Sequence, residues 1–171
     1  MDRVKLPVML LSACLALCAG CSASTRPSLP EGWKTVTHRG VDISVPRSWT
    51  VEPWHANCGV TSPTVFIGPE GRAVLYCPLS VPGGSEVILG ALPQVGGKAP
   101  VPQSINGLKA LVTTTQAVFH GSLGATITYI YVSLPTKEMT IFVMVGDSAR
   151  APGGAPGRAM QIVETIHSAG K

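Results

Sequence analysis

The sequence has few charged and few aromatic residues, and its basic residues do not cluster. Only 13% of the 171 residues are charged, and 5% are Phe, Trp or Tyr. The 13 Lys and Arg residues stand apart from one another, although the formal net charge is +4. This scattering argues against a nucleic-acid interface, which needs a basic patch or stripe. With so little charge, the surface must be covered largely by uncharged polar and small residues.

Groups that perform catalysis are also sparse. The chain has 9 Asp and Glu residues and 4 His residues, and no two carboxylates have the spacing of an obvious acid–base pair. The glutamates fall mostly at predicted turns or on polar faces: Glu31, Glu52, Glu70, Glu86, Glu138 and Glu164. Glycine-rich nucleotide motifs and Walker sequences are missing. We therefore predict a protein that is not an enzyme and that needs no cofactor and no metal.

One segment resembles part of a nucleophile motif. His120-Gly-Ser-Leu-Gly124 has the Ser and the last Gly of the Gly-x-Ser-x-Gly pattern, but His120 replaces the first Gly. The segment also lies between predicted strands, whereas the motif joins a strand to a helix. A turn is the better interpretation.

Apolar runs long enough to cross a membrane are missing as well. The longest apolar run lies near the start of the sequence. Leu6–Leu17 covers 12 positions, whereas a membrane-spanning helix needs about 20. Arg3 and Lys5 precede this run and small residues follow it, which is the pattern of a secretory signal. We predict that residues 1–20 are a signal peptide.

The predicted signal ends at Cys21. Ala19-Gly20-Cys21 resembles the lipobox of bacterial lipoproteins, although Cys18 stands where that family usually has Leu. The resemblance implies cleavage before Cys21 and attachment of diacylglycerol and further acyl chains such as palmitate to this residue. It also implies a protein anchored by lipid to the extracytoplasmic face of the cell membrane. The alternative is an ordinary secretory signal with a free thiol at Cys21.

Two segments follow the predicted cleavage site. Residues 21–32 contain Pro27 and Pro30 and no apolar cluster, so we expect the lipidated cysteine to be followed by a flexible tether. Residues 33–168 are long enough for a single domain with its own core.

Cys58 and Cys77 remain after the signal and the lipidated cysteine. In an oxidising compartment two cysteines favour a disulfide, which would close a loop of about 20 residues and contribute about 3 kcal/mol. A metal site is the alternative, because His55 lies three residues before Cys58. Zinc sites need four ligands at characteristic spacings, and no CxxC or HxxxH pair is present, so the disulfide is preferred.

Alternating apolar and polar residues predict a domain built mainly from strands. The arms that flank Pro135-Thr-Lys-Glu138 form the clearest predicted hairpin. Its second arm, Met139–Val145, is apolar on both faces and is expected in the middle of the sheet. The predicted strands are Trp33–His38, Val41–Val45, Thr64–Ile67, Ala73–Cys77, Glu86–Leu92, Leu108–Phe119, Ala125–Leu134 and Met139–Val145. The first two are expected to pair as a hairpin, and so are the third and fourth.

A helix is predicted near the end of the sequence. Apolar residues recur there at the i, i+3, i+4 and i+7 spacing of one helical face, at Ala159, Ile162, Val163 and Ile166. Pro156 suits the first turn and Gly170 a C-terminal stop. His167 would lie in the last turn, where its charge favours the helix dipole.

The predicted fold class is α+β, with an antiparallel β-sheet of about six to eight strands built from hairpins and a C-terminal amphipathic helix packed on it. Trp49 is expected in the core. Pro93–Gly107 is rich in Pro and Gly and is predicted to be a long loop. A plain surface connection is preferred there over a functional loop.

Gly40-Val-Asp-Ile-Ser-Val-Pro-Arg-Ser-Trp49 is the most distinctive segment after the signal. It resembles the "strand, Pro, two residues, Trp" opening of the lipoproteins grouped with PsbP, DcrB and the actinobacterial LpqN-type proteins. The final helix after a β-hairpin is similar to that family as well. The resemblance implies an antiparallel sheet with helices packed on it, in a family in which many members have no established activity.

Two functions are compatible with these observations. The first is a non-catalytic binding or interaction module in the cell envelope, with another envelope protein as its partner. The second is a carrier that holds a small apolar molecule between sheet and helix. Trp54 and His55 are the residues that we expect at a binding surface.

Overall fold

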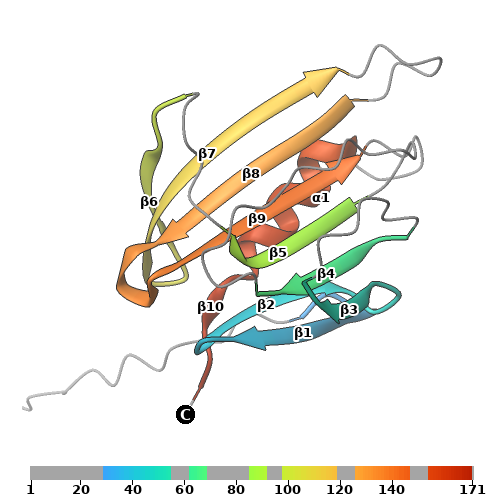
Figure 1. The fold of residues 1–171 in the computed structure, drawn as a ribbon, viewed down its shortest axis with the longest axis horizontal. Coiled ribbons are helices and arrows are strands. Elements are labelled where there is room, and N and C mark those ends of the chain that lie inside the picture. Colours follow the sequence, from blue (N-terminus) through green and yellow to red (C-terminus); the bar gives the residue numbers. More distant parts are fainter. Residues whose placement is uncertain are drawn as a thin grey trace, which may run out of the picture.

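The structure is a computed structural model, and it describes residues 29–54, 62–68, 85–91, 98–118, 126–146 and 154–170. These residues confirm the predicted α+β fold (Figure 1). The strands form two sheets, a 7-stranded sheet in the order β3-β4-β5-β9-β8-β7-β6 and a 3-stranded sheet in the order β1-β2-β10. The elements are β1 (Trp33–His38), β2 (Val41–Pro46), β3 (Thr50–Pro53), β4 (Thr64–Ile67), β5 (Ser85–Ala91), β6 (Val101–Ile105), β7 (Leu108–Val118), β8 (Thr126–Leu134), η1 (Pro135–Lys137), β9 (Met139–Gly146), α1 (Gly154–Glu164) and β10 (His167–Ser168).

Two of the three predicted hairpins are confirmed. β1 and β2 pair antiparallel, and the turn between them consists of Arg39 and Gly40, with φ of 47° and 70°. Positive φ at both central residues is typical of the tight turn that suits the twist of a hairpin. β8 and β9 pair antiparallel around the short η1 segment.

β9 lies in the middle of the larger sheet, as its two apolar faces predicted. All of its residues are buried. Ile141, Val143 and Val145 point to one side and share a core with α1, with β1 and β2, and with Trp49, which is buried as expected. Phe142 and Met144 point to the other side, into a second apolar cluster. A strand with cover on both sides is apolar along its whole length.

The larger sheet is not antiparallel throughout. β3 and β4 are parallel to each other, and β4 and β5 are parallel too. Strand β3 was not predicted, because most of its residues are exposed and an edge strand of four residues shows little alternation. The predicted strand Ala73–Cys77, the expected hairpin partner of Thr64–Ile67, lies outside the described residues.

The prediction of a loop over Pro93–Gly107 is wrong for its second half. β6 lies within it and pairs antiparallel with β7 at the edge of the sheet. The first four residues of β6 are exposed, and Pro102 is tolerated only because the strand is at the edge. Asn106 and Gly107 form the turn, with φ of 45° and 81°. Asn-Gly is a strong hairpin signal, and it predicts β6 better than the hydropathy of the strand's own residues does.

The helix ends earlier than predicted. α1 includes Pro156 in its first turn but stops at Glu164, so Gly170 is not its stop signal. The Thr165 hydroxyl donates to the carbonyl of Ile162 at 2.7 Å and accepts from the Ser44 amide at 2.8 Å. These bonds tie the end of the helix to β2, and the chain then continues as strand β10 along β2.

His167 therefore does not lie in the last turn of the helix. It belongs to β10, with Nε2 3.4 Å from the Asp42 carboxylate. Its Nδ1 lies 2.7 Å from the carbonyl oxygen of Thr165. The carboxylate also accepts a hydrogen bond of 2.5 Å from the Thr37 hydroxyl. Nε2 makes no hydrogen bond among the described residues, so β10 is held to the smaller sheet by its pairing with β2 and by the bond of 3.0 Å from the Ala169 amide to the Gly40 carbonyl.

Candidate functional site

Most of the residues predicted to carry function lie outside the described part of the chain. This holds for Cys21, His55, Cys58 and Cys77, so the lipidation, the disulfide and the role of His55 stay predictions. Trp54 is described. It follows β3 directly, its amide donates to the carbonyl of Ile67 at 2.9 Å, and its half-buried side chain packs against the second apolar cluster.

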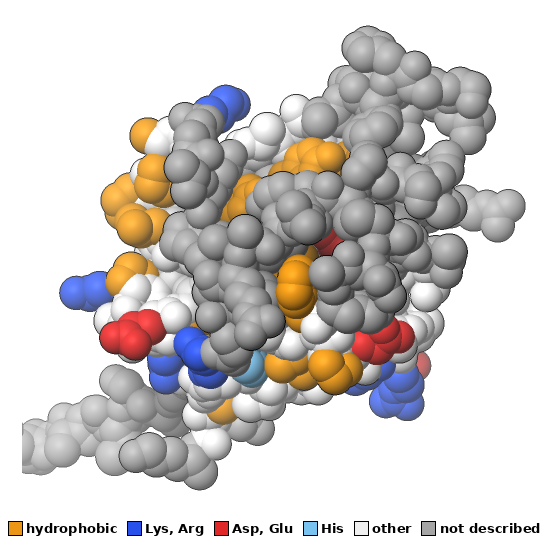
Figure 2. All heavy atoms as spheres, viewed as in Figure 1, with side chains coloured by type: hydrophobic (Ala, Val, Ile, Leu, Met, Phe, Trp, Pro, Cys, Tyr) orange, Lys and Arg blue, Asp and Glu red, His pale blue; other side chains and the backbone are white. Residues whose placement is uncertain are grey.

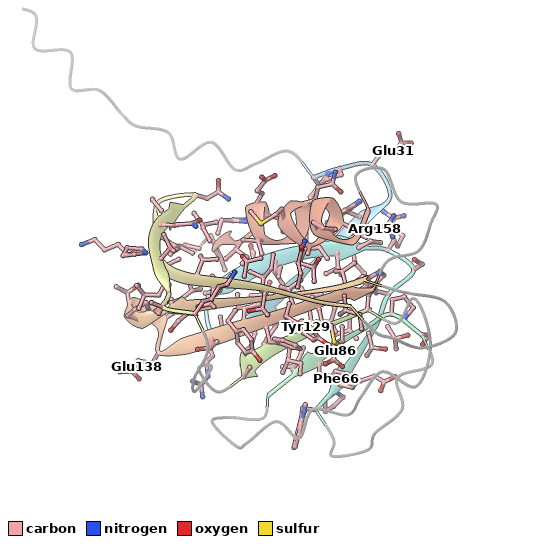
Figure 3. The ribbon with its side chains drawn as sticks, turned by 90° about the horizontal axis from the view of Figure 1, so that it is seen from above. Glu31, Phe66, Glu86, Tyr129, Glu138 and Arg158 are labelled. Carbon is pink, nitrogen blue, oxygen red and sulfur yellow. The ribbon has the colours of Figure 1, made fainter. Side chains whose placement is uncertain are left out.

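This second cluster lies on the side of the larger sheet that faces away from α1, and we call that side the Glu86 face. Figure 3 shows Phe66, Glu86 and Tyr129 close together on it, from strands β4, β5 and β8, with α1 on the opposite side of the sheet. The Glu86 face is defined by Phe66, Glu86, Ile88, Tyr129, Tyr131, Phe142 and Met144.

Strand register places these side chains in two rows. Glu86 pairs with Met144, and Met144 pairs with Tyr129, so the three form one row across β5, β9 and β8. The adjacent row runs through Phe66, Ile88, Phe142 and Tyr131. Neighbouring strands lie about 4.8 Å apart, so the backbones of Glu86 and Tyr129 are separated by about 10 Å.

The aromatic rings of the Glu86 face contact one another. The rings of Tyr129 and Phe142 stack with centroids 6.1 Å apart and an angle of 26° between their planes. The rings of Tyr131 and Phe142 are 4.9 Å apart and tilted by 46°. Such distances are typical of favourable aromatic pairs. The result is a continuous aromatic cluster beside Glu86, in which Phe66, Tyr131 and Phe142 are buried and Tyr129 is half-buried.

Glu86 is the one carboxylate in this apolar environment. The strand Ser85–Ala91 is otherwise apolar or small, and Glu86 is its one half-buried position. Burial raises the pKa of Glu86 from 4.5 to about 7, because water stabilises the charged form and the cluster does not. Within the described residues, no hydrogen bond or ion pair to this carboxylate occurs. At neutral pH the group therefore exists in both its acid and its anionic form.

Tyr129 responds to the same environment. Burial raises the pKa of its phenol, and the charge of Glu86 raises that pKa further. The second effect indicates that Glu86 and Tyr129 interact electrostatically across Met144. The pair can accept a cation or exchange hydrogen bonds with a ligand.

Three described basic residues show how the cations are placed relative to this pair. Lys109 of β7 is on the same side of the sheet, but it is six positions along the strand from Thr115, the residue in register with Tyr129, which corresponds to about 20 Å. Arg158 is on α1, on the far side of the sheet (Figure 3), and Lys34 donates to the carbonyl of Trp49. Figure 2 shows the molecule from the side of the Glu86 face, with some hydrophobic side chains near the middle of the view and Lys and Arg side chains at its top, left, lower left and lower right. The carboxylate thus lacks a described cationic neighbour.

Sequence reasoning missed Glu86, because it assigned the glutamates mostly to turns or polar faces. The signal that was available is a single charge within an apolar run, since Glu86 is followed by Val, Ile, Leu, Gly and Ala. A buried carboxylate with a perturbed pKa is a candidate functional group. That Tyr129 lies near Glu86 can be inferred only from the strand order, because β9 lies between β5 and β8 in the sheet.

The space between the larger sheet and α1 has a different character. Ala159, Ile162 and Ile166 are fully buried there, as are Ile141 and Val143 from β9. Side chains with no accessible surface leave no water-sized space next to them. The described part of this layer is a packed core.

Two further findings concern the residues that the structure describes. They contain no group of three or more His, Cys, Asp or Glu side chains that could hold a metal ion. No helix among them has the length and apolarity needed to cross a membrane. Comparisons of the chain with protein families, with curated proteins and with solved structures found no match, so the resemblance to the PsbP, DcrB and LpqN-type proteins stays a prediction.

Proposed function

We propose that this protein is a lipid-anchored binding module on the extracytoplasmic face of the cell membrane, and that it contacts its ligand through the Glu86 face. The observation that carries the proposal is the half-buried carboxylate of Glu86 at an otherwise aromatic and aliphatic cluster. A buried charge without a partner destabilises a fold. An apolar residue in its place would give a more stable sheet, so the carboxylate is best explained by a role in binding.

The location rests on the sequence. Arg3 and Lys5, the short apolar run and Ala19-Gly20-Cys21 together have the pattern of a lipoprotein signal. Two or more acyl chains on Cys21 would hold the domain at the membrane without any spanning helix. The tether of residues 21–32 would let the Glu86 face reach molecules near the membrane surface.

Binding is favoured over transport of an apolar molecule between sheet and helix. A carrier needs an apolar cavity, and the described side chains between β9 and α1 are packed without exposed surface. Binding is also favoured over catalysis. The Glu86 face offers one carboxyl group and the phenols of Tyr129 and Tyr131, with no His or Cys in the described cluster, whereas a catalytic site usually combines several groups of matched pKa.

Site-specific photocrosslinking in intact cells tests the binding surface. The crosslinking amino acid benzoylphenylalanine would replace Trp54, which borders the Glu86 face, and in a matched control it would replace Met160, which is exposed on α1. We expect an adduct from position 54 that is lost when Glu86→Gln is added, and no such adduct from position 160. Equal adducts from both positions, or an adduct from position 54 that does not depend on Glu86, would contradict the proposal.

Mass spectrometry of the N-terminal peptide tests the anchor separately. We expect the peptide to start at Cys21 and to carry the mass of a diacylglyceryl group and its acyl chains. A Cys21→Ser variant should leave the membrane fraction. An unmodified cysteine at position 21 in membrane-bound protein would refute the anchor and would leave the binding surface unaffected.

A further inference from the structure

We infer that β1 is an interface between two copies of this chain, in which β1 pairs antiparallel with β1 of the second copy and Val36 of both copies lies at the two-fold axis. The pairing would join the two 3-stranded sheets into one continuous sheet. The inference goes beyond the proposed function, because β1 belongs to the smaller sheet and not to the Glu86 face. It is carried by the open edge of β1, the direction of its backbone groups and its exposed threonines.

The two sheets end in four described edge strands, and three of them have features that protect an edge. The edge strands are β1, β10, β3 and β6. β10 has two residues, β3 has four and ends at Pro53, and β6 contains Pro102. Short edge strands and proline hinder pairing with another chain. β1 has six residues and no proline, so it is the described edge strand best suited to accept a further strand.

Hydrogen bonds around β2 show which backbone groups of β1 point away from the sheet. In an antiparallel pair, successive residues alternate between bonding the partner strand and pointing away from it. The Arg47 amide donates to the Gly32 carbonyl at 2.8 Å, so the even-numbered positions of β1 bond β2. The amide of Ser44, which is in register with Thr35, donates on the other side of β2 to the residue after α1. The amides and carbonyls of Thr35 and Thr37 therefore point away from β2.

The side chains along this edge leave the outward backbone groups accessible. Thr35 and Thr37 are exposed, whereas Val36 between them is buried in the core. Lys34 donates to the carbonyl of Trp49, so its ammonium group is held on its own chain. Figure 1 shows β1 at the lower margin of the molecule. Because β-branched residues suit extended pairing, the edge combines exposed backbone with high strand propensity.

Two-fold symmetry makes a second copy a suitable occupant. A symmetric dimer brings the same surface of both copies together, and an axis perpendicular to the sheet makes the two β1 strands antiparallel. With Val36 at the axis, Thr35 lies opposite Thr37 of the second copy, and all outward amides and carbonyls of these threonines are bonded. With Thr35 at the axis, Thr37 would face Trp33. The Trp33 amide already donates to the Pro30 carbonyl at 3.1 Å, so one Thr37 carbonyl in each copy would stay unbonded.

The cross-strand pairs in this register are compatible with one another. Thr35 faces Thr37 twice, and threonine pairs across strands are favourable. Lys34 faces His38 of the second copy. Burial and the charge of Arg39 lower the pKa of His38, so this imidazole is uncharged at neutral pH. The register therefore creates no pair of like charges within β1.

Disulfide formation in intact cells, with diamide as the oxidant, tests the register. Two full-length copies with different tags are expressed together, one with Thr35→Cys and the other with Thr37→Cys. Opposite residues of a hydrogen-bonded pair lie about 5.5 Å apart, within the reach of a disulfide, whereas diagonal neighbours at about 7–8 Å are beyond it. We expect the mixed dimer in at least about fivefold excess over the dimer that either variant forms alone.

Two controls make the result specific to β1. The chain without an added cysteine shows how much dimer the native cysteines form. The pair Val101→Cys and Gln103→Cys places the thiols on β6, another exposed edge strand, and should give no excess of mixed dimer. An equal yield from Thr35→Cys alone or from the β6 pair would overturn the inference. A disulfide from Thr35→Cys to a different protein, in place of the second copy, would overturn it as well.

Charge substitutions test the same surface without added thiols. Thr35→Lys together with Thr37→Lys places like charges opposite each other, and should reduce the recovery of one tagged copy with the other by at least about fivefold. Thr35→Glu together with Thr37→Lys places opposite charges there and should restore the recovery. Both double variants replace exposed residues, and urea unfolding shows whether they are folded. Equal recovery of the two folded variants would refute the pairing, and the cysteine pair decides if one of them does not fold.

Discussion

Glu86 makes the stability of this protein depend on pH in a direction opposite to that of an ordinary ion-paired carboxylate. Burial raises the pKa of Glu86 from 4.5 to about 7 in the folded state. Between these two values the folded protein binds more protons than the unfolded chain does, so the free energy of unfolding falls as pH rises. The stability associated with this group is fully present below about pH 4.5 and is lost as pH rises through about pH 7.

The magnitude follows from the same two pKa values. A tenfold change in an acid constant corresponds to about 1.4 kcal/mol, so the loss amounts to about 3 kcal/mol when Glu86 is fully ionised, near pH 8.5. Glu86→Gln keeps the shape of the side chain and removes its titration. The variant should match the wild type in stability near pH 4.5 and exceed it by about 3 kcal/mol near pH 8.5.

Urea unfolding followed by tryptophan fluorescence measures this difference at a series of pH values. Subtracting the wild-type free energy from that of Glu86→Gln cancels the titration of groups common to both proteins. One of these is His38, whose pKa is lowered by burial and by the charge of Arg39. The exposed control Glu164→Gln should give a flat difference. If the difference for Glu86→Gln is also flat with pH, the reasoning about its environment is refuted.

Three further substitutions test how the elements are held together, each by urea unfolding at neutral pH. Asn106→Ala should lower the free energy of unfolding by about 1–3 kcal/mol. It removes two side-chain hydrogen bonds to carbonyls at the end of α1, and it places Ala at a positive φ. Asn106→Gly keeps the turn and should lower the free energy of unfolding by less. Thr165→Val should cost about 1–3 kcal/mol, since the buried Ser44 amide loses its acceptor, and a cost near zero would mean that this bond contributes nothing. Ile162→Ala in the core should cost about 2–5 kcal/mol, while Met160→Ala on the exposed side of α1 should cost far less; similar costs would contradict the assigned orientation of the helix.

Those parts of the fold that depend on local patterns could be predicted from the sequence. The alternation in Val41–Val45, the turn at Pro135 and the apolar stripe of the helix each report on neighbours within a few residues. The central position of β9 also followed, because a strand that is apolar on both faces needs cover on both sides. These signals depend on periods of 2 and 3.6 residues, which a single sequence displays directly.

The features that were missed depend on pairing between distant segments. The parallel arrangement of β3, β4 and β5 leaves no mark in alternation, because parallel and antiparallel strands have the same side-chain period. The early end of α1 is set by bonds from Thr165 to Ser44, more than a hundred positions away in the chain. β6 had a local signal in Asn106-Gly107, but its exposed residues and Pro102 concealed the strand.

The candidate site could be predicted from the sequence only in part, for the same reason. Glu86 could have been recognised as a lone charge in an apolar strand, yet nothing local indicates which residues surround it. Its neighbours come from β9 and β8, more than 40 positions further along the sequence. Only the strand order brings Met144 and Tyr129 into line with it.

The two sides of the larger sheet differ in their aromatic content. All Phe and Tyr side chains among the described residues lie on the Glu86 face, whereas the core shared with α1 consists of aliphatic residues together with Trp33 and Trp49. Most residues on both sides are buried, so packing explains the aromatic residues, whereas it does not explain the carboxylate of Glu86. The Glu86→Gln variant distinguishes a role of this residue in binding from a role in the structure alone. If Glu86 binds the ligand, the substitution should increase stability and decrease ligand binding at the same pH. Opposite signs are expected of a residue that is kept for function at a cost in stability, and a purely structural residue would change both in the same direction.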